Sequence, residues 1–267
     1  MDAGMKKTIC AITIGLLLAN APRAMADDLD LHWGSTVSLG YSDGNYGTSK
    51  NTNVLLERTK LSAETGNFQF TVGMPYMRIS GWGLIVMDAM GNPIIINRNT
   101  SLPANVRSGF GDLNLSTTYS IPPEVLDNFK ISLSGRVKVP TASGRRHLST
   151  GKVDYGANID VERAVGPWQP FITFGYLIQG KPAGFVLKNT LSVSTGTSFE
   201  ISNQLVAIAS YDYDSPSSPL VSSSQDLSWS LSWIVNDKIT LTGYATKGIT
   251  SGSPDIGTGL ILAYGFN

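Results

Sequence analysis

Charged side chains alternate with apolar ones in two neighbouring stretches of the sequence, 128–140 and 152–165. The charged residues on the polar sides of these stretches are Arg136, Lys138, Asp154, Asp160 and Glu162. If the connection over 141–151 makes the stretches antiparallel neighbours, Lys138 lies near Asp154. Basic and acidic groups placed in this way either form ion pairs that fill space or set a field across the path of a polar solute. Ion pairs are the simpler interpretation, and the sequence leaves both open.

Catalysis has little support in the sequence. The chain holds only two histidines, His32 and His147, and no G-x-S-x-G motif. A surface hydrolase could use His147, Ser149 and Asp154, with Ser143 as a second candidate hydroxyl. Serine and aspartate are common in all the loop-like segments, however, so this spacing defines no geometry. We therefore expect no enzyme, no cofactor and no metal site, since clustered Cys or His ligands are also missing from the sequence.

A long polar and glycine-containing segment, 81–109, carries two apolar patches separated by Gly91-Asn92-Pro93. The residues of these patches are Leu84, Ile85, Val86, Met87, Ile94, Ile95 and Ile96. Segments of this length between regular elements are commonly functional. We consider two interpretations: a hairpin that folds inward and narrows a channel, or an outward extension of the flanking strands. Inward folding leaves no distinctive mark in a sequence, so the choice needs a structure.

These residues must be positioned by β-strands, because the sequence alternates with period two over most of its length. The alternation is clearest over 113–121, 131–139, 153–162 and 227–235. Including weaker segments, we predict twelve strands: 31–41, 52–63, 67–80, 110–121, 128–140, 152–165, 168–179, 184–198, 201–213, 225–235, 238–247 and 255–266.

The connections between these strands alternate in length. Those after even strands are short, whereas those after odd strands are mostly longer and rich in Gly, Ser, Asn and Pro. This pattern is typical of an antiparallel transmembrane β-barrel with short periplasmic turns and longer extracellular loops. Lipid satisfies no backbone hydrogen bond, so such a sheet must close on itself. We therefore predict an all-β, single-domain barrel of about twelve strands over residues 27–267, in the outer membrane of a Gram-negative bacterium.

Composition and the first residues agree with an exported protein. The 267 residues include equal numbers of acidic and basic side chains, 20 of each, which disfavours nucleic acid as a partner. Residues 1–26 contain Lys6 and Lys7, an apolar run, and Ala24-Met25-Ala26, as in a cleavable signal peptide. Cys10 lies inside that segment, so the mature chain has no disulfide to stabilise it.

The final predicted strand has one apolar face and ends on Phe266 followed by Asn267. It resembles the C-terminal strand by which outer-membrane proteins are recognised for assembly, displaced by one residue. We expect most aromatic side chains to form belts at the membrane interfaces, in contact with outer-membrane lipids. The residues considered for these belts are Trp33, Trp82, Trp168, Trp229, Trp233, Tyr119, Tyr244, Tyr264 and Phe266.

Several short blocks, in consistent order, resemble the outer-membrane "transporter" proteins described as putative MetA-pathway phenol-degradation proteins. The blocks are Met74-Pro75-Tyr76, Gly109-Phe110-Gly111-Asp112-Leu113, Val137-Lys138-Val139-Pro140-Thr141, Leu148-Ser149-Thr150-Gly151, and the segment from Lys247-Gly248-Ile249 through Ser253-Pro254-Asp255 to Tyr264-Gly265-Phe266. The resemblance covers most of 67–266, and 81–109 is the least similar part. It implies an outer-membrane barrel that serves the uptake of small aromatic compounds.

We therefore expect a channel for the passive uptake of small molecules, apolar or aromatic ones in particular. In this interpretation, the alternate residues that face the lumen determine what passes. A structural or adhesive barrel with a filled lumen is the first alternative, and an outer-membrane hydrolase is the second.

Overall fold

The computed structural model describes residues 30–46, 50–81, 84–87, 93–97, 105–122, 129–143 and 148–266. The predicted signal peptide, 1–26, lies outside these ranges. Within them the regular elements are strands: β1 (His32–Gly44), β2 (Thr52–Thr65), β3 (Phe68–Gly81), β4 (Leu84–Met87), β5 (Pro93–Asn97), β6 (Asn105–Phe110), β7 (Leu113–Ser120), β8 (Phe129–Val139), β9 (Asp154–Arg163), β10 (Trp168–Ile178), β11 (Thr190–Ser202), β12 (Leu205–Asp214), β13 (Ser224–Ile234), β14 (Ile239–Gly248) and β15 (Ile256–Gly265). Among the described residues, no helix has the length and apolar character needed to cross a membrane.

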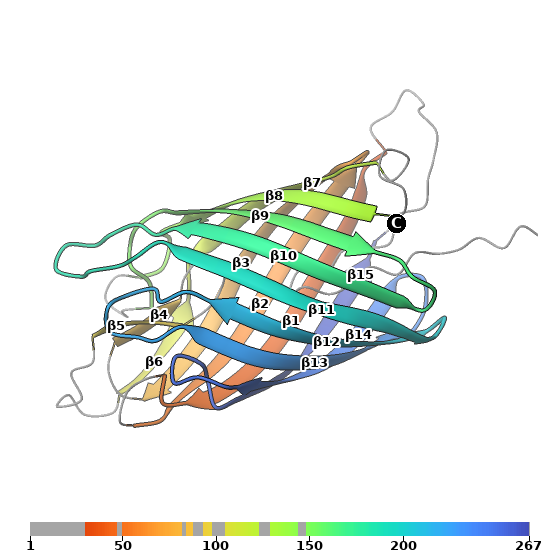
Figure 1. The fold of residues 1–267 in the computed structure, drawn as a ribbon. Helices are drawn as coiled ribbons and strands as arrows, with labels where there is room; N and C mark the ends of the chain where they lie inside the picture. Colours follow the sequence, from red (N-terminus) through yellow and green to blue (C-terminus); the bar gives the residue numbers. More distant parts are fainter. Residues whose placement is uncertain are drawn as a thin grey trace, which may run out of the picture.

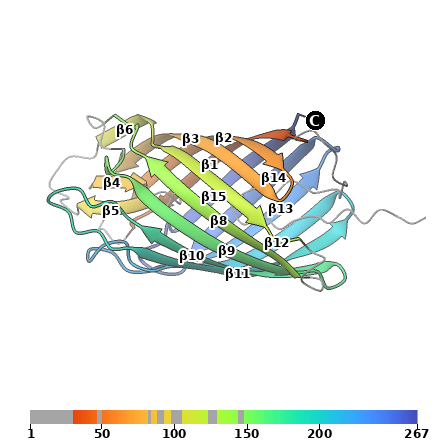
Figure 2. The same ribbon diagram turned by 90° about the horizontal axis from the view of Figure 1, so that it is seen from above.

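Thirteen of the strands form one antiparallel sheet that closes into a barrel (Figures 1 and 2). Sequence neighbours pair along the chain, β1 pairs with β15, and β2 pairs with β3. β6 and β7 occupy a single position in the wall, because β6 pairs with the second half of β3 and β7 with its first half. The Gly111 amide, between these two strands, donates to the Pro75 carbonyl oxygen at 2.8 Å. The wall thus has twelve strand positions, which confirms the predicted all-β barrel.

Three predicted strands differ clearly from the structure, the third being 201–213, because β12 begins only at Leu205. The predicted strand 110–121 corresponds mainly to β7, and β6 lies almost wholly within the predicted loop 81–109. Between β6 and β7 the chain carries one extra residue relative to β3. The predicted strand 184–198 is wrong at both ends, since β11 spans Thr190–Ser202. Gly184 has a left-handed φ of 83° and lies in the preceding loop. At the other end, a register shift between Glu200 and Ser202 lets β11 continue past the expected turn.

The two ends of the barrel differ in the length of their connections. The turn end, which holds the start of β1 and the end of β15, has connections as short as Gly66-Asn67 and Asn203-Gln204. The loop end holds the longer segments 45–51, 82–112, 140–153, 179–189, 215–223 and 249–255. This is the alternation that the sequence predicts. Whether the turn end faces the periplasm stays a prediction.

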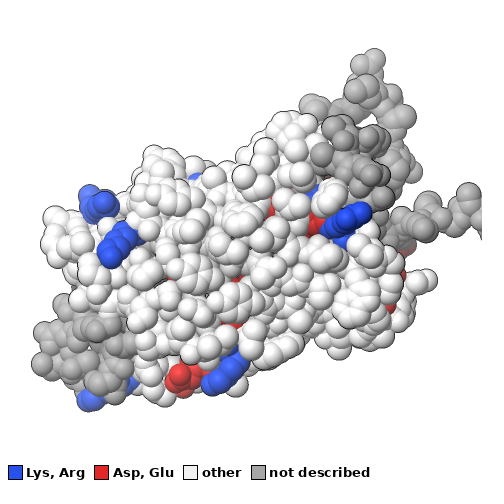
Figure 3. All heavy atoms as spheres, viewed as in Figure 1, with Lys and Arg blue, Asp and Glu red and all other residues white. Residues whose placement is uncertain are grey.

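The outer surface of the wall is apolar. Side chains that point outward at alternate positions are large and exposed, such as Phe70, Leu133, Trp229 and Leu260. In the space-filling view few charged side chains interrupt the uncharged wall (Figure 3). An exterior of this kind suits contact with hydrocarbon rather than water.

The aromatic residues considered for interface belts divide between the two faces. Trp33, Trp168, Trp233, Tyr264 and Phe266 are among those exposed on the outside. The expectation for Tyr244 was wrong. Tyr244 lies on the inner face, because its register partners Gly259 and Ser230 belong to that face. Its ring lies against Gly40 and Gly259, where any side chain would collide with it. Trp82 lies outside the described residues.

Candidate solute-binding lumen

Hydroxyl groups cover much of the inner face of the wall. Facing residues on neighbouring strands form hydrogen bonds between Thr118 and Ser134 at 2.9 Å and between Ser232 and Thr242 at 2.9 Å. These pairs arise because period-two alternation directs every second side chain of each strand inward. The lumen is therefore polar, in contrast to the exterior.

The predicted proximity of Lys138 and Asp154 is confirmed. Their Nζ and Oδ2 atoms are 2.7 Å apart, and both side chains are only 1% exposed. The sequence did not indicate that Asp112 would join them, with its Oδ2 atom 3.4 Å from the Lys138 Nζ atom. Thr150 completes the surroundings of the ammonium by accepting a hydrogen bond at 3.2 Å. Lys138 is thus enclosed by oxygen atoms at the loop end.

The two carboxylates that hold Lys138 also hold loops. Asp112 accepts a hydrogen bond from the Ala142 amide at 3.0 Å and another from the Ser149 hydroxyl. Asp154 accepts one from the Gly180 amide at 2.9 Å. The Lys138 group, formed by Lys138, Asp112 and Asp154, therefore fastens two loops to the wall. Ser149 and Asp154 therefore take part in these structural contacts and not in the hydrolase arrangement considered above. His147, the third member of that arrangement, lies outside the described residues.

The remaining charged candidates lie on the inner face nearer the turn end. Asp160 accepts a hydrogen bond from the Thr173 hydroxyl at 2.7 Å, and Glu162 accepts one from the Gln169 amide nitrogen at 2.6 Å. Arg136 faces the lumen and acts electrostatically on Asp160. Their predicted role in selectivity stays a proposal.

Within the segment 81–109, β4 pairs only with β5 in a separate hairpin, whereas residues 105–109 belong to β6 and extend the wall along β3. Val86 is fully buried against Leu187 and Phe185, which belong to the loop between β10 and β11. The wall places this loop several strand positions away from β3, so the hairpin reaches across the loop end rather than prolonging the wall (Figure 2). The side chains of Leu84, Ile85, Met87, Ile94, Ile95 and Ile96 lie outside the described part.

A second apolar cluster closes over β2 and β3 at the loop end. Tyr46, Val54, Met77, Ile79 and Leu148 are all buried together. Tyr46 and Leu148 come from loops, whereas the other three point inward from the wall. Burial raises the pKa of Tyr46 to about 12. The loop end is therefore packed where these loops meet the wall.

Sequence reasoning missed a group of basic residues on β2. Arg58 and Lys60 occupy alternate inward positions, and both Arg58 and Arg136 act electrostatically on Lys60. The Lys60 stem lies over Gly73, whose missing side chain leaves room for it. The sequence did contain a signal, because positions 58, 60, 62 and 64 are all polar. It was obscured by Leu55-Leu56-Glu57, in which apolar and polar residues do not alternate.

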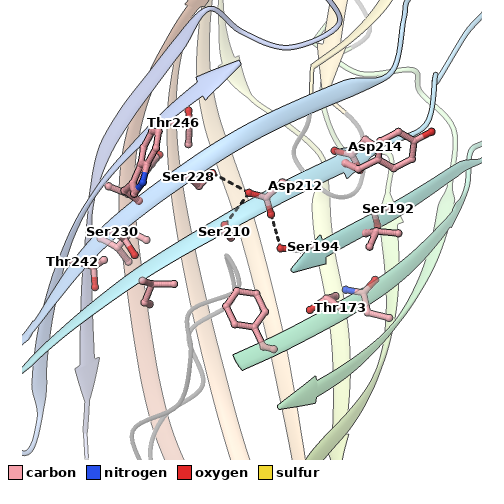
Figure 4. A pocket seen from close by; sticks show the side chains of 18 of the residues that line it. Thr173, Ser192, Ser194, Ser210, Asp212, Asp214, Ser228, Ser230, Thr242 and Thr246 are labelled. Carbon is pink, nitrogen blue, oxygen red and sulfur yellow. Dashed lines mark hydrogen bonds between the residues drawn. The ribbon is translucent and has the colours of Figure 1, made fainter. Parts of the chain in front are cut away.

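Acidic residues that sequence reasoning also missed lie on the inner faces of β12 and β13. The Asp212 carboxylate accepts hydrogen bonds from Ser194 at 2.5 Å, Ser210 at 3.0 Å and Ser228 at 3.0 Å (Figure 4). Asp226 lies directly opposite Asp212 in the ladder. In the wall order, β12 is five positions from β2 in one direction and seven in the other. The basic and acidic sides of the lumen are thus nearly opposite.

A cavity of about 180 Å³ lies on the acidic side of the lumen and is lined by residues of β8 to β15. Arg136, Asp212 and several hydroxyl groups line it together with Phe171, Ile208, Ile261 and Tyr244. Phe171 and Ile208 pack with Val206 into a small apolar cluster. The cavity wall therefore combines one cation, Arg136, with Asp212, hydroxyl groups and an apolar patch. No group of three or more residues that could hold a metal ion occurs within the described ranges.

Comparison of the sequence with protein-family profiles and with curated proteins finds no match. Solved structures with a similar fold include "KdgM porin", which matches with a TM-score of 0.53 and 8% identity over 87% of this chain and 99% of that one. A "NanC porin" structure matches with a TM-score of 0.52 and 12% identity over 86% and 98%. The "P. putida toluene transporter TodX" gives 0.49 and 13% over 91% and 81%. The two porins support the barrel fold, and the resemblance to the MetA-pathway proteins stays a prediction.

Proposed function

We propose that this protein is an outer-membrane channel through which small molecules pass passively. The observation that carries the proposal is a closed barrel whose exterior is apolar and whose polar interior contains a cavity. An apolar exterior suits lipid, and a polar interior suits the passage of solutes. In this proposal the turn end faces the periplasm, and the last strand, β15, is the part that the assembly machinery recognises.

Apolar or aromatic solutes are the preferred cargo in this proposal. Its support is the sequence resemblance described above together with the apolar patch of Phe171, Ile208 and Ile261 inside an otherwise polar lumen. The β4–β5 hairpin and its contact with Leu187 would form the constriction that a solute meets first.

A structural barrel with a closed lumen is the second candidate function. The packing of the loop end favours it, since Tyr46 and Leu148 are each only 1% exposed. The two functions differ in whether these loops ever open a continuous path.

Solute flux into proteoliposomes tests the channel proposal. We expect an aromatic acid such as benzoate to enter faster than a small sugar at equal gradient, and faster than into protein-free vesicles. Leu148→Ser should raise flux by loosening the loop end, whereas Leu220→Ser, at a loop leucine that is already 37% exposed, should not. Flux equal to that of empty vesicles in all three proteins would contradict the channel and favour the structural barrel.

A further inference from the structure

We propose that the cavity beside Asp212 binds a small organic cation, with its ammonium group on the oxygen atoms around Asp212 and its apolar body on Phe171 and Ile208. This inference rests on the proposed channel function and names the class of aromatic solute that the lumen holds. The entry of benzoate relative to a sugar tests the channel itself and does not require this site.

The first step of the argument is the direction of the hydrogen bonds along the cavity wall. Three serine hydroxyls that line the cavity donate to the Asp212 carboxylate (Figure 4), and they belong to Ser194, Ser210 and Ser228. A fourth lining hydroxyl, that of Thr173, donates to another carboxylate. A hydroxyl has one proton to donate, so these four oxygens can only accept a further hydrogen bond. An ammonium group, with three donors and no acceptor, matches them.

The second step is the charge of the cavity wall. Asp212 and Asp214 both line it, whereas Arg136 is the one cationic side chain of the described residues that does so. Arg136 is on β8, four strand positions from β12, and acts electrostatically on Asp160. Opposite Asp212 in the ladder, the buried Oδ1 atom of Asp226 has no hydrogen-bond partner among the described residues. The β12 side of the cavity therefore carries an excess of negative charge, which attracts a cation.

The third step is the position of the apolar patch next to these oxygens. Gly196 lies between Phe171 and Ser210 in the ladder. The Phe171 ring extends over Gly196, since its Cζ atom would be 2.9 Å from a side-chain carbon added there. Ile208 is two residues from Ser210 on β12, so its side chain lies on the same face, about 7 Å further towards the turn end. A cation whose apolar body begins beside its ammonium fits this order of groups.

The size of the cavity limits the length of that body. Its volume is about 180 Å³. A cavity of about 150 Å³ is enough to hold a benzene molecule. One aromatic ring joined to an ammonium through a single carbon therefore fills the space, and the site favours such one-ring amines over larger cations.

Equilibrium binding to the purified barrel in a non-ionic detergent, measured by calorimetry at neutral pH, tests the site without requiring conduction. The probes are benzylammonium, methylammonium, benzyl alcohol and benzoate. Benzylammonium should bind most tightly, because methylammonium has no ring, benzyl alcohol has no charge and benzoate has the opposite charge. Equal binding of benzylammonium and benzyl alcohol, or tighter binding of benzoate, would overturn the proposal.

A matched pair of variants separates this site from a general charge effect of the lumen. Asp212→Asn should weaken benzylammonium binding about tenfold, the size expected for a lost charge-assisted hydrogen bond. The control, Glu64→Gln, removes a carboxylate on β2, five strand positions from β12, where Gln69 donates to it. It should leave binding within about twofold of wild type, because salt screens charges at this separation. Equal weakening by the two variants would overturn the site.

Two further variants test the parts of the site separately and keep the test available if Asp212→Asn does not fold. Ser228→Ala removes one acceptor while Asp212 keeps its charge, and should weaken the binding of both ammonium probes. Phe171→Leu should reduce the preference for benzylammonium over methylammonium and leave methylammonium binding unchanged. Full affinity in Ser228→Ala together with full preference in Phe171→Leu would overturn the proposal.

Conduction then distinguishes the two proposals. In planar bilayers benzylammonium should block the KCl current, and Asp212→Asn should raise the half-blocking concentration to the same extent as it weakens binding. Binding that depends on Asp212 in a barrel that never conducts would refute the channel and retain the site. Conduction that benzylammonium does not affect, with no binding by calorimetry, would retain the channel and refute the site.

Discussion

Lys60 and Lys138 occupy the same row of the sheet, linked through Gly73 and Asn114, yet their surroundings are opposite. Lys138 is enclosed by two carboxylates and is 1% exposed, whereas Lys60 stands among other cations. Three strand pairings along this row thus separate Lys138, whose charge fastens loops, from Lys60, whose charge faces the lumen. Residue type and strand register do not determine the role of a lumenal charge. That role depends on the loops that cover the charged side chain.

The largest expected effect comes from removing the Lys138 ammonium. Lys138→Met leaves Asp112 and Asp154 buried without their cation, and breaking a buried ion pair in this way costs about 3–5 kcal/mol. We expect a clear fall in the temperature at which the barrel unfolds in detergent, measured by its heat-dependent migration in gels. Lys181→Met, at an exposed loop lysine, is the control and should leave that temperature unchanged.

The same change at the other lysine should have no such cost. Lys60→Met removes like-charge repulsion, so the unfolding temperature should stay the same or rise. A fall comparable to that of Lys138→Met would mean that Lys60 is also structurally paired, and the contrast between the two lysines would be lost.

A double variant measures how far Asp154 and Lys138 act as a unit. Asp154→Asn in the Lys138→Met background removes one of the stranded charges, so the double variant should be less destabilised than the sum of the two single changes. Coupling between contacting charged groups is typically about 0.5–3 kcal/mol. Strict additivity in the unfolding measurement would show that Lys138 depends mainly on Asp112.

A smaller effect is expected at Gly73, under the Lys60 stem. A methyl group there would approach the Lys60 Cγ atom to 3.1 Å, so the stem must shift by a few tenths of an ångström. Gly73→Ala should lower the unfolding temperature of the barrel less than Lys138→Met does, because only the flexible Lys60 stem has to move. Gly135→Ala is the control, because no atom lies within 4 Å of the added methyl group.

The smallest expected effect concerns whether water reaches the buried cluster around Tyr46 at the loop end. Burial raises the pKa of Tyr46 to about 12, above its ordinary value of 10.0. The stability that its neutral phenol contributes is therefore complete below pH 10 and falls as the pH rises from 10 towards 12. Difference absorbance between wild type and Tyr46→Phe should show one tyrosine titrating near pH 12. A midpoint near 10 would show that water reaches this cluster.

The contrast between the lysines also shows what sequence reasoning could reach. Alternation predicted the wall, the loop lengths and the Lys138–Asp154 contact, because each depends only on neighbouring strands. Asp112 was missed because it lies in the interruption between β6 and β7, where register shifts by one residue. The opposition of Lys60 and Asp212 depends on closure of the whole barrel, which no local pattern encodes. Tyr244 was assigned to the wrong face because Gly40, over which its ring reaches, lies on β1 and is distant in sequence.

The seam between β1 and β15 has a consequence for how the chain folds. Ser35 pairs with Tyr264 and Asp43 with Ile256, so the first and last strands must meet across more than two hundred intervening residues. Such distant contacts slow folding, because the entropy of a large loop is lost before the pairing forms. Until the last strand arrives, β1 exposes an unpaired edge that can template aggregation. The barrel therefore closes only after β15 is available to pair with β1.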